Sequence, residues 1–486
     1  MRLSIKRKSE KVSPDPRRVI ARFFFTGEER AVILIQKVMT LTKEQVFAEV
    51  SPLLQDFSKR HRSITTKLLK HCERVEPYIE RAGYTLSAID EYTKLLIGAY
   101  FTHEYSIESA AFFNPSIVED PDRSNLEEGQ QRVILSFRAV GEGHVSSMVF
   151  RRAIIDKDNN ITVIPSGNYV DEAERIRNVI YKKGLFLKKA ADEGIDLEII
   201  DALDKVLNDE FDYESLRKAV MESTQGEESQ RTIRQYHLLL ALSDSYRSIS
   251  FSKDTDISDR VIFPISSLES KGIEDARFVK FTRDDGSSVY YATYTAYDGT
   301  HIMPKLLRTT DFYDFRTSPL HGTGARNKNL ALFPRKINGK YVMLARVDGW
   351  NNYIMYSDNI NVWDEPIKIQ SPQHTWELVQ IGNCGSPIET PQGWLVITHA
   401  VGPMRRYSIG ACLLDLENPE IELGRLSEPL IMPNPDEREG YVPNVVYSCG
   451  SIVHNGEIII PYGLSDHSST FAAVNLQKLL DKILKK

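Results

Sequence analysis

The stretch "DDGSSVYYATYTAYDG", residues 284–299, places a strand-like run of aromatic, β-branched and small residues between two turn signals. Asp-Gly and Asn-Gly dipeptides are typical of tight β-hairpins, because both central residues of such turns need positive φ angles. The same order of turn, strand and polar turn recurs further along the chain. The other copies are "INGKYVMLARVDG" (337–349), "PQGWLVITHAVG" (391–402) and "HNGEIIIPYGLSD" (454–466).

These repeats have a long and fairly regular period. Their first-turn glycines, Gly286, Gly339, Gly393 and Gly456, are about 53, 54 and 63 residues apart. We expect a fifth copy in residues 127–156, which lie between two helical stretches. All-strand repeats of this size are typical of propeller blades. The sequence therefore predicts an all-β five-bladed β-propeller with added α-helical segments, one N-terminal and one inserted after the first blade.

Two segments have helical rather than strand periodicity. Apolar residues recur at mostly helical spacings among charged residues from about residue 28 to 82, and again from 171 to about 246. This pattern indicates amphipathic helices that serve in packing. We expect an N-terminal helical extension in residues 1–100, a first propeller blade in 101–170, a helical insertion in 171–250, and the remaining blades with a C-terminal helix in 251–486.

Composition and charge limit the class of protein. The 486 residues are 41% hydrophobic and 26% charged, with a formal net charge of −6. These values give no bulk electrostatic reason to expect nucleic acid or an anionic membrane as a partner. The basic N-terminus lacks the apolar stretch of a signal peptide, and no run of about eighteen apolar residues predicts a membrane span. The four scattered cysteines are typical of reduced thiols, so we expect a cytoplasmic protein.

Motifs that would predict a cofactor are incomplete. The eleven histidines form no HxH or HxxxH pair. The stretch that begins "DKDNN" at Asp156 lacks the glycine and glutamate of a calcium loop. The stretches "GTGARN" and "GEGHVS" lack the third glycine of a dinucleotide site, and no GxSxG occurs. We therefore expect no metal and no organic cofactor.

In a propeller, the innermost strand of each blade and its adjoining loops face a central pocket. Polar residues at corresponding places in the repeats are then expected to meet there, although they are far apart in the chain. A set of unrelated loop charges is the alternative that the repeat pattern alone leaves open. The residues in question are Arg138, Asp275, Arg346, His399 and Asp466.

The stretch "GIEDARFVKF", residues 272–281, places two acids and an arginine between a glycine and a strand-like run. Cleavage of a glycosidic bond needs a carboxylic acid to protonate the leaving oxygen, and a group on the opposite face to activate water or hold another nucleophile. Asp275 is the candidate acid. Glu274 and Arg277 would shift its pKa in opposite directions.

The order of motifs gives a specific resemblance. The motifs are "FFNPSIV" with "LSFRAVGEG", "GIEDARFVKF" with "YATYTAYDG", "NKNLALFPRKINGKYVMLAR" with "YIMYSDN", "GSPIETPQGWLVITHAVG" with "YSIGACLLDLENP", and "REGYVPNVVYSCGSIV" with "IIIPYGLSD". With these five groups in this order, the chain resembles glycoside hydrolase family 130, the β-mannoside phosphorylases and β-mannosidases, over about residues 100–475.

The resemblance implies a five-bladed propeller and an inverting reaction with Asp275 as the general acid. In the phosphorylases of this family the acid is thought to act through a sugar hydroxyl. Asn114, Arg138 and Asp466 match positions that hold the mannosyl unit in the −1 subsite. Charged groups suit this task because their hydrogen bonds are stronger than neutral ones. The expected substrate-binding residues are Asn114, Arg138, Glu274, Arg277, Asp348 and Asp466.

The attacking group is either phosphate or water. Phosphorylases of this family surround the phosphate with arginine, lysine and histidine, since a dianion must be held by cations. Lys305 stands where those enzymes commonly have arginine, whereas Lys328, Arg346 and His399 supply the rest of the expected phosphate or nucleophile site. Because lysine cannot replace arginine in bidentate binding of an oxyanion, we favour hydrolysis.

A hydrolase needs a carboxylate base, for which Glu377 is the candidate and Asp348 the alternative. We therefore predict an inverting glycoside hydrolase that cleaves β-mannosides. The alternatives are a β-mannoside phosphorylase, with inorganic phosphate as co-substrate and mannose 1-phosphate as product, and a propeller that binds mannosides without cleaving them. The expected partner is a β-linked manno-oligosaccharide, with no nucleic acid or membrane, and the helical segments are candidates for contacts in a homo-oligomer.

Overall fold

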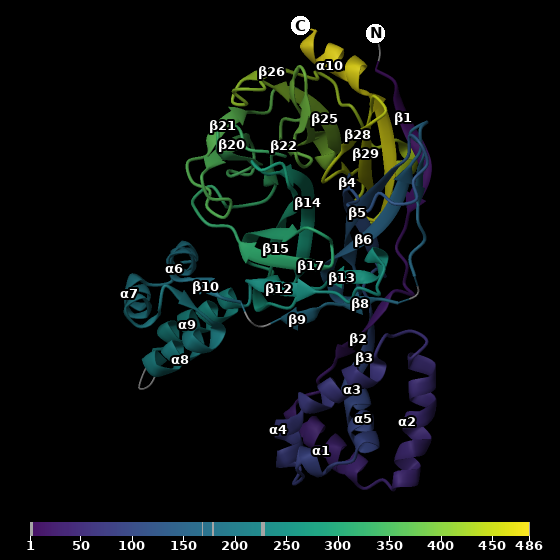
Figure 1. Cartoon of the computed structure of the whole chain (residues 1–486), viewed down its shortest axis with the longest axis vertical. Coiled ribbons are helices and arrows are strands. Elements are labelled where there is room, and N and C mark those ends of the chain that lie inside the picture. Colours follow the sequence, from purple (N-terminus) through teal and green to yellow (C-terminus); the bar gives the residue numbers. More distant parts are fainter. Residues whose placement is uncertain (1–2, 168, 177–178, 225–228, 486) are drawn as a thin grey trace.

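The structure, a computed structural model, describes residues 3–167, 169–176, 179–224 and 229–485. It is built mostly of β-strands, and all but the last of its α-helices gather in two groups within the described residues (Figure 1). In Figure 1 the strands form an upper body, with one helical group below it and the other to one side. The architecture is a β-rich fold that carries helical additions.

The first helical group has an apolar core of its own. Its second helix begins with a capping box, in which the side chains and backbone N–H groups of Thr42 and Gln45 bond reciprocally and stabilise the first turn. Val46, Val50 and Leu68 are buried in the core, as the helical spacing of apolar residues predicts. The helices are α1 (Glu28–Met39), α2 (Lys43–Phe57), α3 (Ile64–Glu73), α4 (Glu76–Arg81) and α5 (Glu91–Tyr100).

The second helical group lies between strands of the body in the sequence and packs around Phe186, Leu203, Leu216 and Leu239, which are buried. It includes a short antiparallel pair, β10 (Tyr181–Lys182) with β11 (Glu210–Phe211). Its helices are α6 (Lys183–Asp192), α7 (Leu197–Val206), α8 (Tyr213–Thr224) and α9 (Gln230–Ser243). One further helix, α10 (Leu476–Leu484), follows the last strand.

The largest sheet contains the strands that position the candidate residues. It runs in the order β4-β5-β6-β14-β15-β16-β17-β12-β9, and β7, β8 and β13 pair beside this path. The strands are β4 (Ala111–Glu119), β5 (Gln131–Val140), β6 (Ser146–Ile155), β7 (Ile161–Val163), β8 (Asp171–Glu172), β9 (Glu174–Ile176), β12 (Arg247–Ser250), β13 (Arg260–Ile262), β14 (Gly272–Thr282), β15 (Ser288–Tyr297), β16 (Ile302–Thr309) and β17 (Asp314–Pro319).

The strands from β18 onwards, together with β1, form three smaller sheets. The first has β18 (Ala331–Leu332), β19 (Tyr341–Ala345), β20 (Asn352–Ser357) and β21 (Ile367–Gln370). The second has β22 (Gln380–Asn383), β23 (Ile388–Thr390), β24 (Gly393–Val401), β25 (Tyr407–Leu414) and β26 (Glu422–Arg425). The third has β1 (Ile5–Val12), β27 (Val446–Tyr447), β28 (Ile452–His454), β29 (Glu457–Leu464) and β30 (Ser468–Asn475).

The hairpins of the quoted repeats are present. The turn at residues 284–287 joins β14 to β15, and Gly286 there has a φ of 80°. Gly339 precedes β19 with a φ of 79°. The left-handed conformation explains the choice of glycine in these turns.

The first strand was not predicted. β1 pairs with β30, so residues that we placed in a helical extension belong to the last sheet. Its sequence, "IKRKSEKV", is mostly charged and half-exposed, and it therefore lacks the alternation of apolar residues by which strands are identified. A second early strand, β2 (Val19–Phe23), pairs with β3 (Thr102–Ser106) and connects the first helical group to the body.

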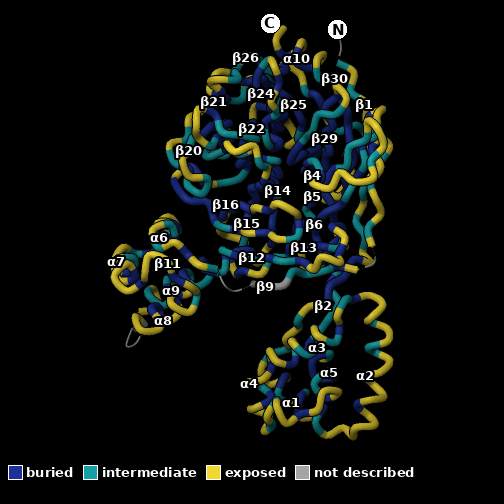
Figure 2. Tube along the Cα trace, in the orientation of Figure 1, coloured by how far each residue is buried: buried dark blue, intermediate teal, exposed yellow. Residues whose placement is uncertain are grey.

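The division of the body into five blades stays a prediction. The strands form separate sheets around the body, and none of these sheets closes on itself within the residues that the structure describes. Figure 2 shows that burial is concentrated between the strands of the body, whereas the outer sides of the helices are exposed. Across the described ranges, no helix is long and apolar enough to cross a membrane.

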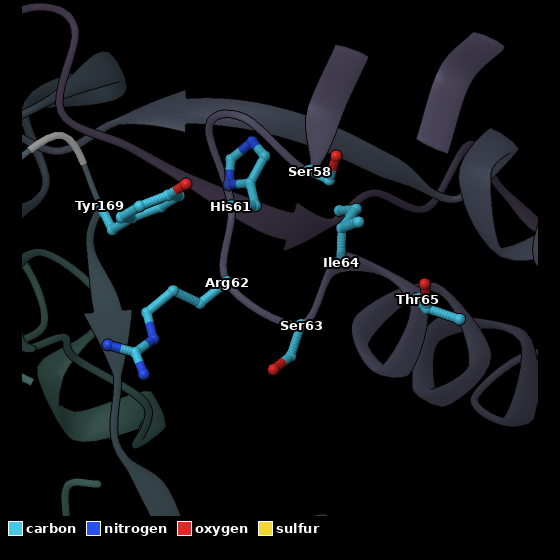
Figure 3. Close-up of a pocket in the computed structure, with 7 residues that line it drawn as sticks. All are labelled: Ser58, His61, Arg62, Ser63, Ile64, Thr65 and Tyr169. Atoms are coloured by element: carbon cyan, nitrogen blue, oxygen red, sulfur yellow. The ribbon is translucent and has the colours of Figure 1, made fainter. Parts of the chain in front are cut away.

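Polar contacts join the first helical group to the rest of the chain. The turn between α2 and α3 lies near Tyr169, and the pocket between them is shown in Figure 3. His61 Nε2 is 2.7 Å from Glu104 Oε1, and Arg62 pairs with Asp254 next to β12. The residues that line the pocket are Ser58, His61, Arg62, Ser63, Ile64, Thr65 and Tyr169.

Candidate active site

Three candidate residues have left-handed backbone conformations. Asn114, Asp275 and Asp466 have φ angles of 51°, 54° and 52°. Two of them interrupt strands, because the pairing of β4 with β5 shifts at residues 113–116 and that of β14 with β15 shifts at residues 274–277. Such bulges re-aim side chains and are frequent beside functional sites. The bulges therefore break the strand alternation at Asn114 and Asp275.

Asp275 is held by residues that are distant in the sequence. Asn114 Nδ2 donates to Asp275 Oδ1 over 2.6 Å, and Arg138 Nη1 lies 3.9 Å from the same oxygen. Arg277 Nη1 donates to the backbone carbonyl of Asp275 over 2.9 Å. Burial acts to raise the pKa of Asp275, but the charges of Arg138, Arg277 and Lys328 outweigh it, so the pKa lies below its usual value. Asp275 is therefore a carboxylate in a cationic setting.

Glu274 holds two of these cations in place. Arg138 Nη2 donates to Glu274 Oε1 over 2.8 Å, and Lys328 Nζ bonds to Glu274 Oε2. Both bonds are charge-assisted because the partners carry opposite charges, and only 9% of the Glu274 side chain is exposed. Glu274 thus orients Arg138 and Lys328 next to Asp275.

Asp466 follows β29 in the same region. Its pKa is raised to about 7, because burial and the negative charges of Asp275 and Glu274 outweigh the attraction of Arg138. Near neutral pH this carboxyl group therefore exists in both protonation states. The residues that the sequence predicted for a −1 subsite, Asn114, Arg138 and Asp466, lie together around Asp275.

A second cationic group lies beside the first. Arg346 Nη1 donates to His399 Nε2 over 3.1 Å, and His399 Nδ1 donates to the backbone carbonyl of Asn383 over 3.0 Å. Burial, together with Arg346 and Arg277, lowers the pKa of His399 well below its usual value. The imidazole is therefore neutral, with its proton on Nδ1 and its Nε2 atom as an acceptor.

Uncharged residues link the two groups. Arg277 Nη2 and Asn329 Nδ2 both donate to the Tyr447 hydroxyl oxygen, each over 2.7 Å. Asn383 Nδ2 donates to the backbone carbonyl of Asn329 over 2.6 Å, and the carbonyl of Asn383 in turn accepts from His399. A continuous hydrogen-bonded path therefore runs from the backbone of Asp275 to Arg346.

Sequence reasoning missed Asn329, Asn383 and Tyr447. The only signal was their position inside or next to quoted motifs that carry charged candidates, such as "NKNL" and "VVYSCG". An uncharged side chain is typical of many roles, and only the fold shows that these three meet. These three side chains are buried and uncharged, so they connect the cationic groups by hydrogen bonds without neutralising the charge of those groups.

The site has buried donors that no protein group satisfies. The Nε atoms of Arg138, Arg277 and Arg346 are buried, and none has a hydrogen-bond partner in the part of the chain that the structure describes. Buried donors normally find a partner because an unmet one costs about 1–3 kcal/mol. Three unmet guanidinium donors around one region indicate a place for an oxygen-rich anion.

Lys305, which the sequence assigned to a phosphate site, is paired with a carboxylate in the structure. Its ammonium group is fully buried and lies 2.7 Å from Glu269 Oε1, while Arg247 pairs with the other carboxylate oxygen. A buried ammonium needs a carboxylate partner, and Glu269 fills that need. Burial lowers the pKa of Lys305 to about 8. Lys305 therefore forms a buried ion pair with Glu269 next to the large sheet.

Glu377 and Asp348, the candidate bases, also have other partners. Glu377 is buried, accepts the N–H groups of residues 373 and 374 over 2.7 and 2.9 Å, and lies 3.5 Å from Arg425. Asp348 is exposed and accepts hydrogen bonds from residues 350, 351 and 353. Desolvation acts to raise the pKa of Asp348, but these hydrogen bonds outweigh it and lower the pKa to about 2. Both carboxylates stabilise their own loops, and the structure brings neither into contact with Asp275.

Comparisons with known proteins identify the family. The model of glycoside hydrolase family 130, described as beta-1,4-mannooligosaccharide phosphorylase, matches residues 230–485. The 1,2-beta-oligomannan phosphorylase of Thermoanaerobacter sp. (strain X514) is 39% identical over 228 residues, which are 44% of this chain and 73% of that protein. The beta-1,2-mannobiose phosphorylase of Listeria innocua is 28% identical over 255 residues, 49% of this chain and 69% of that protein.

A solved complex of the Listeria innocua beta-1,2-mannobiose phosphorylase with beta-1,2-mannobiose aligns with a TM-score of 0.46 and 21% identity, over 78% of this chain and 93% of that one. The family match and the Thermoanaerobacter relative confirm the resemblance that the five groups of motifs indicated. This chain belongs to glycoside hydrolase family 130.

Proposed function

We propose that this chain is a β-mannoside phosphorylase, which transfers a mannosyl unit from a β-linked manno-oligosaccharide to inorganic phosphate and releases mannose 1-phosphate. The relatives named above carry the name of phosphorylases, which supports phosphate over water. This proposal replaces the sequence-based preference for hydrolysis.

The excess of unmet cationic donors carries the proposal. Arg277, Arg346, Lys328 and Arg138 surround the region, and three of the four have a buried Nε atom without a partner in the described chain. The carboxylates of Glu274 and Asp275 balance only part of this charge, and the pKa of Asp466 is raised towards neutrality. A phosphate dianion would satisfy the donors and balance the charge.

Two observations on the predicted water site support phosphate over water. The preference for water rested on Lys305 in place of an arginine, but Lys305 is buried and paired with Glu269, whose other carboxylate oxygen pairs with Arg247. A hydrolase also needs a free carboxylate base, whereas Glu377 and Asp348 are hydrogen-bonded within their own loops.

The residues divide into three tasks in this proposal. Asn114, Arg138 and Asp466 hold the mannosyl unit, and Asp275 supplies the proton for the leaving oxygen. A phosphate oxygen attacks the anomeric carbon as the bond from that carbon to the leaving oxygen breaks. Arg277, Lys328, Arg346 and His399 lie where cations and a polar neutral ring would hold the attacking phosphate.

Phosphate would also prepare the acid. In the free protein the pKa of Asp275 is lowered by Arg138, Arg277 and Lys328, which favours the ionised form. A dianion bound to Arg277 and Lys328 neutralises part of that charge, and its own charge disfavours a second anion nearby. Binding of phosphate therefore raises the pKa of Asp275 and promotes the protonated form that can act as an acid.

We also infer that the strand groups form the five blades of a propeller. The blades would be β4–β7, β14–β17, β18–β21, β22–β26, and β27–β30 with β1. In support of this division, Arg138, Asp275, His399 and Tyr447 come from four of these groups and still belong to one connected set of contacts.

The test is to incubate the protein with β-1,2- and β-1,4-mannobiose, with and without inorganic phosphate. Phosphate-dependent formation of mannose 1-phosphate supports the proposal. Free mannose formed equally well without phosphate would refute it in favour of hydrolysis. No product under any condition, with binding of either disaccharide, would instead indicate a mannoside-binding protein.

A further inference from the structure

The hydroxyl group of Tyr447 has an unusual set of partners. Its oxygen accepts one hydrogen bond from Arg277 Nη2 and one from Asn329 Nδ2, each over 2.7 Å. A hydroxyl oxygen has two acceptor positions and one proton to donate. Guanidinium and amide nitrogens only donate, so neither partner can receive the Tyr447 proton.

The Tyr447 proton has no hydrogen-bond acceptor among the residues that the structure describes. Within residues 3–167, 169–176, 179–224 and 229–485, no hydrogen bond donated by the Tyr447 hydroxyl is present. Tyr447 is buried, with 7% of its surface exposed, and burial raises the pKa of its phenol, so the proton stays on the oxygen. An unmet hydroxyl in such a place needs an acceptor from outside the chain.

The surroundings of Tyr447 determine the kind of acceptor. Its ring centroid lies 4.8 Å from that of His399, whose Nε2 atom is already taken by Arg346. Arg346 lies within electrostatic range of both Tyr447 and Arg277. Arg277 and Arg346 each have a buried Nε atom without a protein partner. An oxygen of an anion suits this place best, because an anion would accept the Tyr447 proton and also balance the charge of the two guanidinium groups.

We propose that the Tyr447 hydroxyl donates its proton to the phosphate that binds between Arg277 and Arg346, and so is a substrate-contacting residue. This inference rests on the proposed phosphorylase function. The two bonds that the phenol accepts fix its orientation before the phosphate binds, so little reorganisation is needed on binding. Through Asn329 and Asn383, the same phenol connects the acid at position 275 to His399.

The experiment uses the full chain and three proteins: wild type, Tyr447→Phe, and Tyr462→Phe as a matched control. Tyr462, in β29 of the last sheet, is also a buried tyrosine whose hydroxyl is bonded, but it donates to Glu437, which lies in the turn at residues 435–437. Calorimetric titration with inorganic phosphate gives the affinity without turnover. Steady-state rates with mannobiose give separate KM values for phosphate and for the sugar.

We expect Tyr447→Phe to weaken phosphate binding about 10- to 100-fold, the usual worth of a hydrogen bond to a charged group. The KM for phosphate rises by a similar factor, the KM for mannobiose changes little, and Tyr462→Phe binds phosphate as the wild type does. Unchanged phosphate affinity in Tyr447→Phe would overturn this inference but leave the phosphorylase proposal standing. Wild type that neither binds nor uses phosphate would overturn both.

A structure of the wild-type chain with phosphate tests the inference even where Tyr447→Phe does not fold. A phosphate oxygen about 2.7 Å from the Tyr447 oxygen, the usual length of such a bond, supports the contact. A phosphate bound by Arg277 and Arg346 but beyond hydrogen-bond reach of Tyr447 would overturn it.

Discussion

Replacement of Asp275 by asparagine tests whether the carboxyl group acts as a proton donor, because asparagine has nearly the same shape but no acidic proton. Asn114 Nδ2 donates to Asp275 Oδ1 over 2.6 Å, and the carbonyl oxygen of an asparagine accepts the same bond. The backbone at position 275 has a φ of 54°, a conformation that asparagine adopts readily. Asp275→Asn therefore keeps the local geometry and removes only the transferable proton and the charge.

The size of the effect follows from the role of the group. A positioned general acid contributes about 10²- to 10⁴-fold to a rate, so we expect turnover to fall by that factor. The folded-state pKa of Asp275 lies below its usual value, which means that the carboxylate stabilises the fold at neutral pH. That stabilisation is lost as the pH falls through the folded-state pKa. The variant is therefore less stable than wild type at pH 7, by on the order of 1–3 kcal/mol, and the difference shrinks in acid.

The assay is the initial rate of mannose 1-phosphate formation, measured with thermal unfolding at pH 7 to show that the variant is folded. Asp285→Asn is the matched control, because Asp285 lies at the other end of the same hairpin and accepts hydrogen bonds from Ser287. The control is expected to keep wild-type turnover. A folded Asp275→Asn protein that retains more than about a tenth of the wild-type rate would refute the assignment of the acid.

Three further outcomes follow from the contacts described above. Lys305→Met leaves the buried Glu269 with Arg247 as its cationic partner, so the free energy of unfolding falls by about 3–5 kcal/mol. Steady-state kinetics of the folded fraction are expected to show an unchanged KM for phosphate. Glu377→Gln weakens the contacts that hold its loop, so we expect a lower melting temperature and unchanged turnover. Loss of turnover at wild-type stability would instead support Glu377 as the catalytic base. Asp466→Asn mimics the protonated carboxyl, whose pKa is raised to about 7. Wild type loses stability as the pH rises from about 4 to 7, so the melting temperature of this variant relative to wild type is expected to be higher at pH 8 than at pH 4.

Several features of the fold were predictable because their causes are local. The hairpin at 284–287 needs a left-handed residue, and Gly286 marks it in the sequence as clearly as in the structure. The helical segments were visible from the spacing of residues such as Val46 and Val50, since burial on one side of a helix leaves a periodic trace. β1 leaves no such trace, because its strand is charged and is defined by its partner β30.

The candidate site was predictable in part. The motifs led to Asn114, Arg138 and Asp275, which lie together in the structure. Asn114 and Asp275 are hydrogen-bonded although they are 161 positions apart in the sequence. The assignment of Lys305 to a phosphate site stays a prediction, and the sequence showed no sign of its ion pair with Glu269, because a sequence displays the charge of a side chain but not its partner. Tyr447 was not predicted as a site residue, because its side chain is uncharged and the sequence does not show its partners.

The sequence by itself determined where the two helical segments, the hairpins of the repeats and their tight turns lie, and which charged residues are available for chemistry. Each of these depends on a residue and its near neighbours. Only the tertiary structure decided how those charges are paired: Glu269 takes Lys305, Arg425 and two backbone amides take Glu377, and the guanidinium groups around Asp275 keep unmet donors. The physical reason is that a buried charge must be matched by whatever the folded chain brings beside it, and this depends on contacts between distant strands.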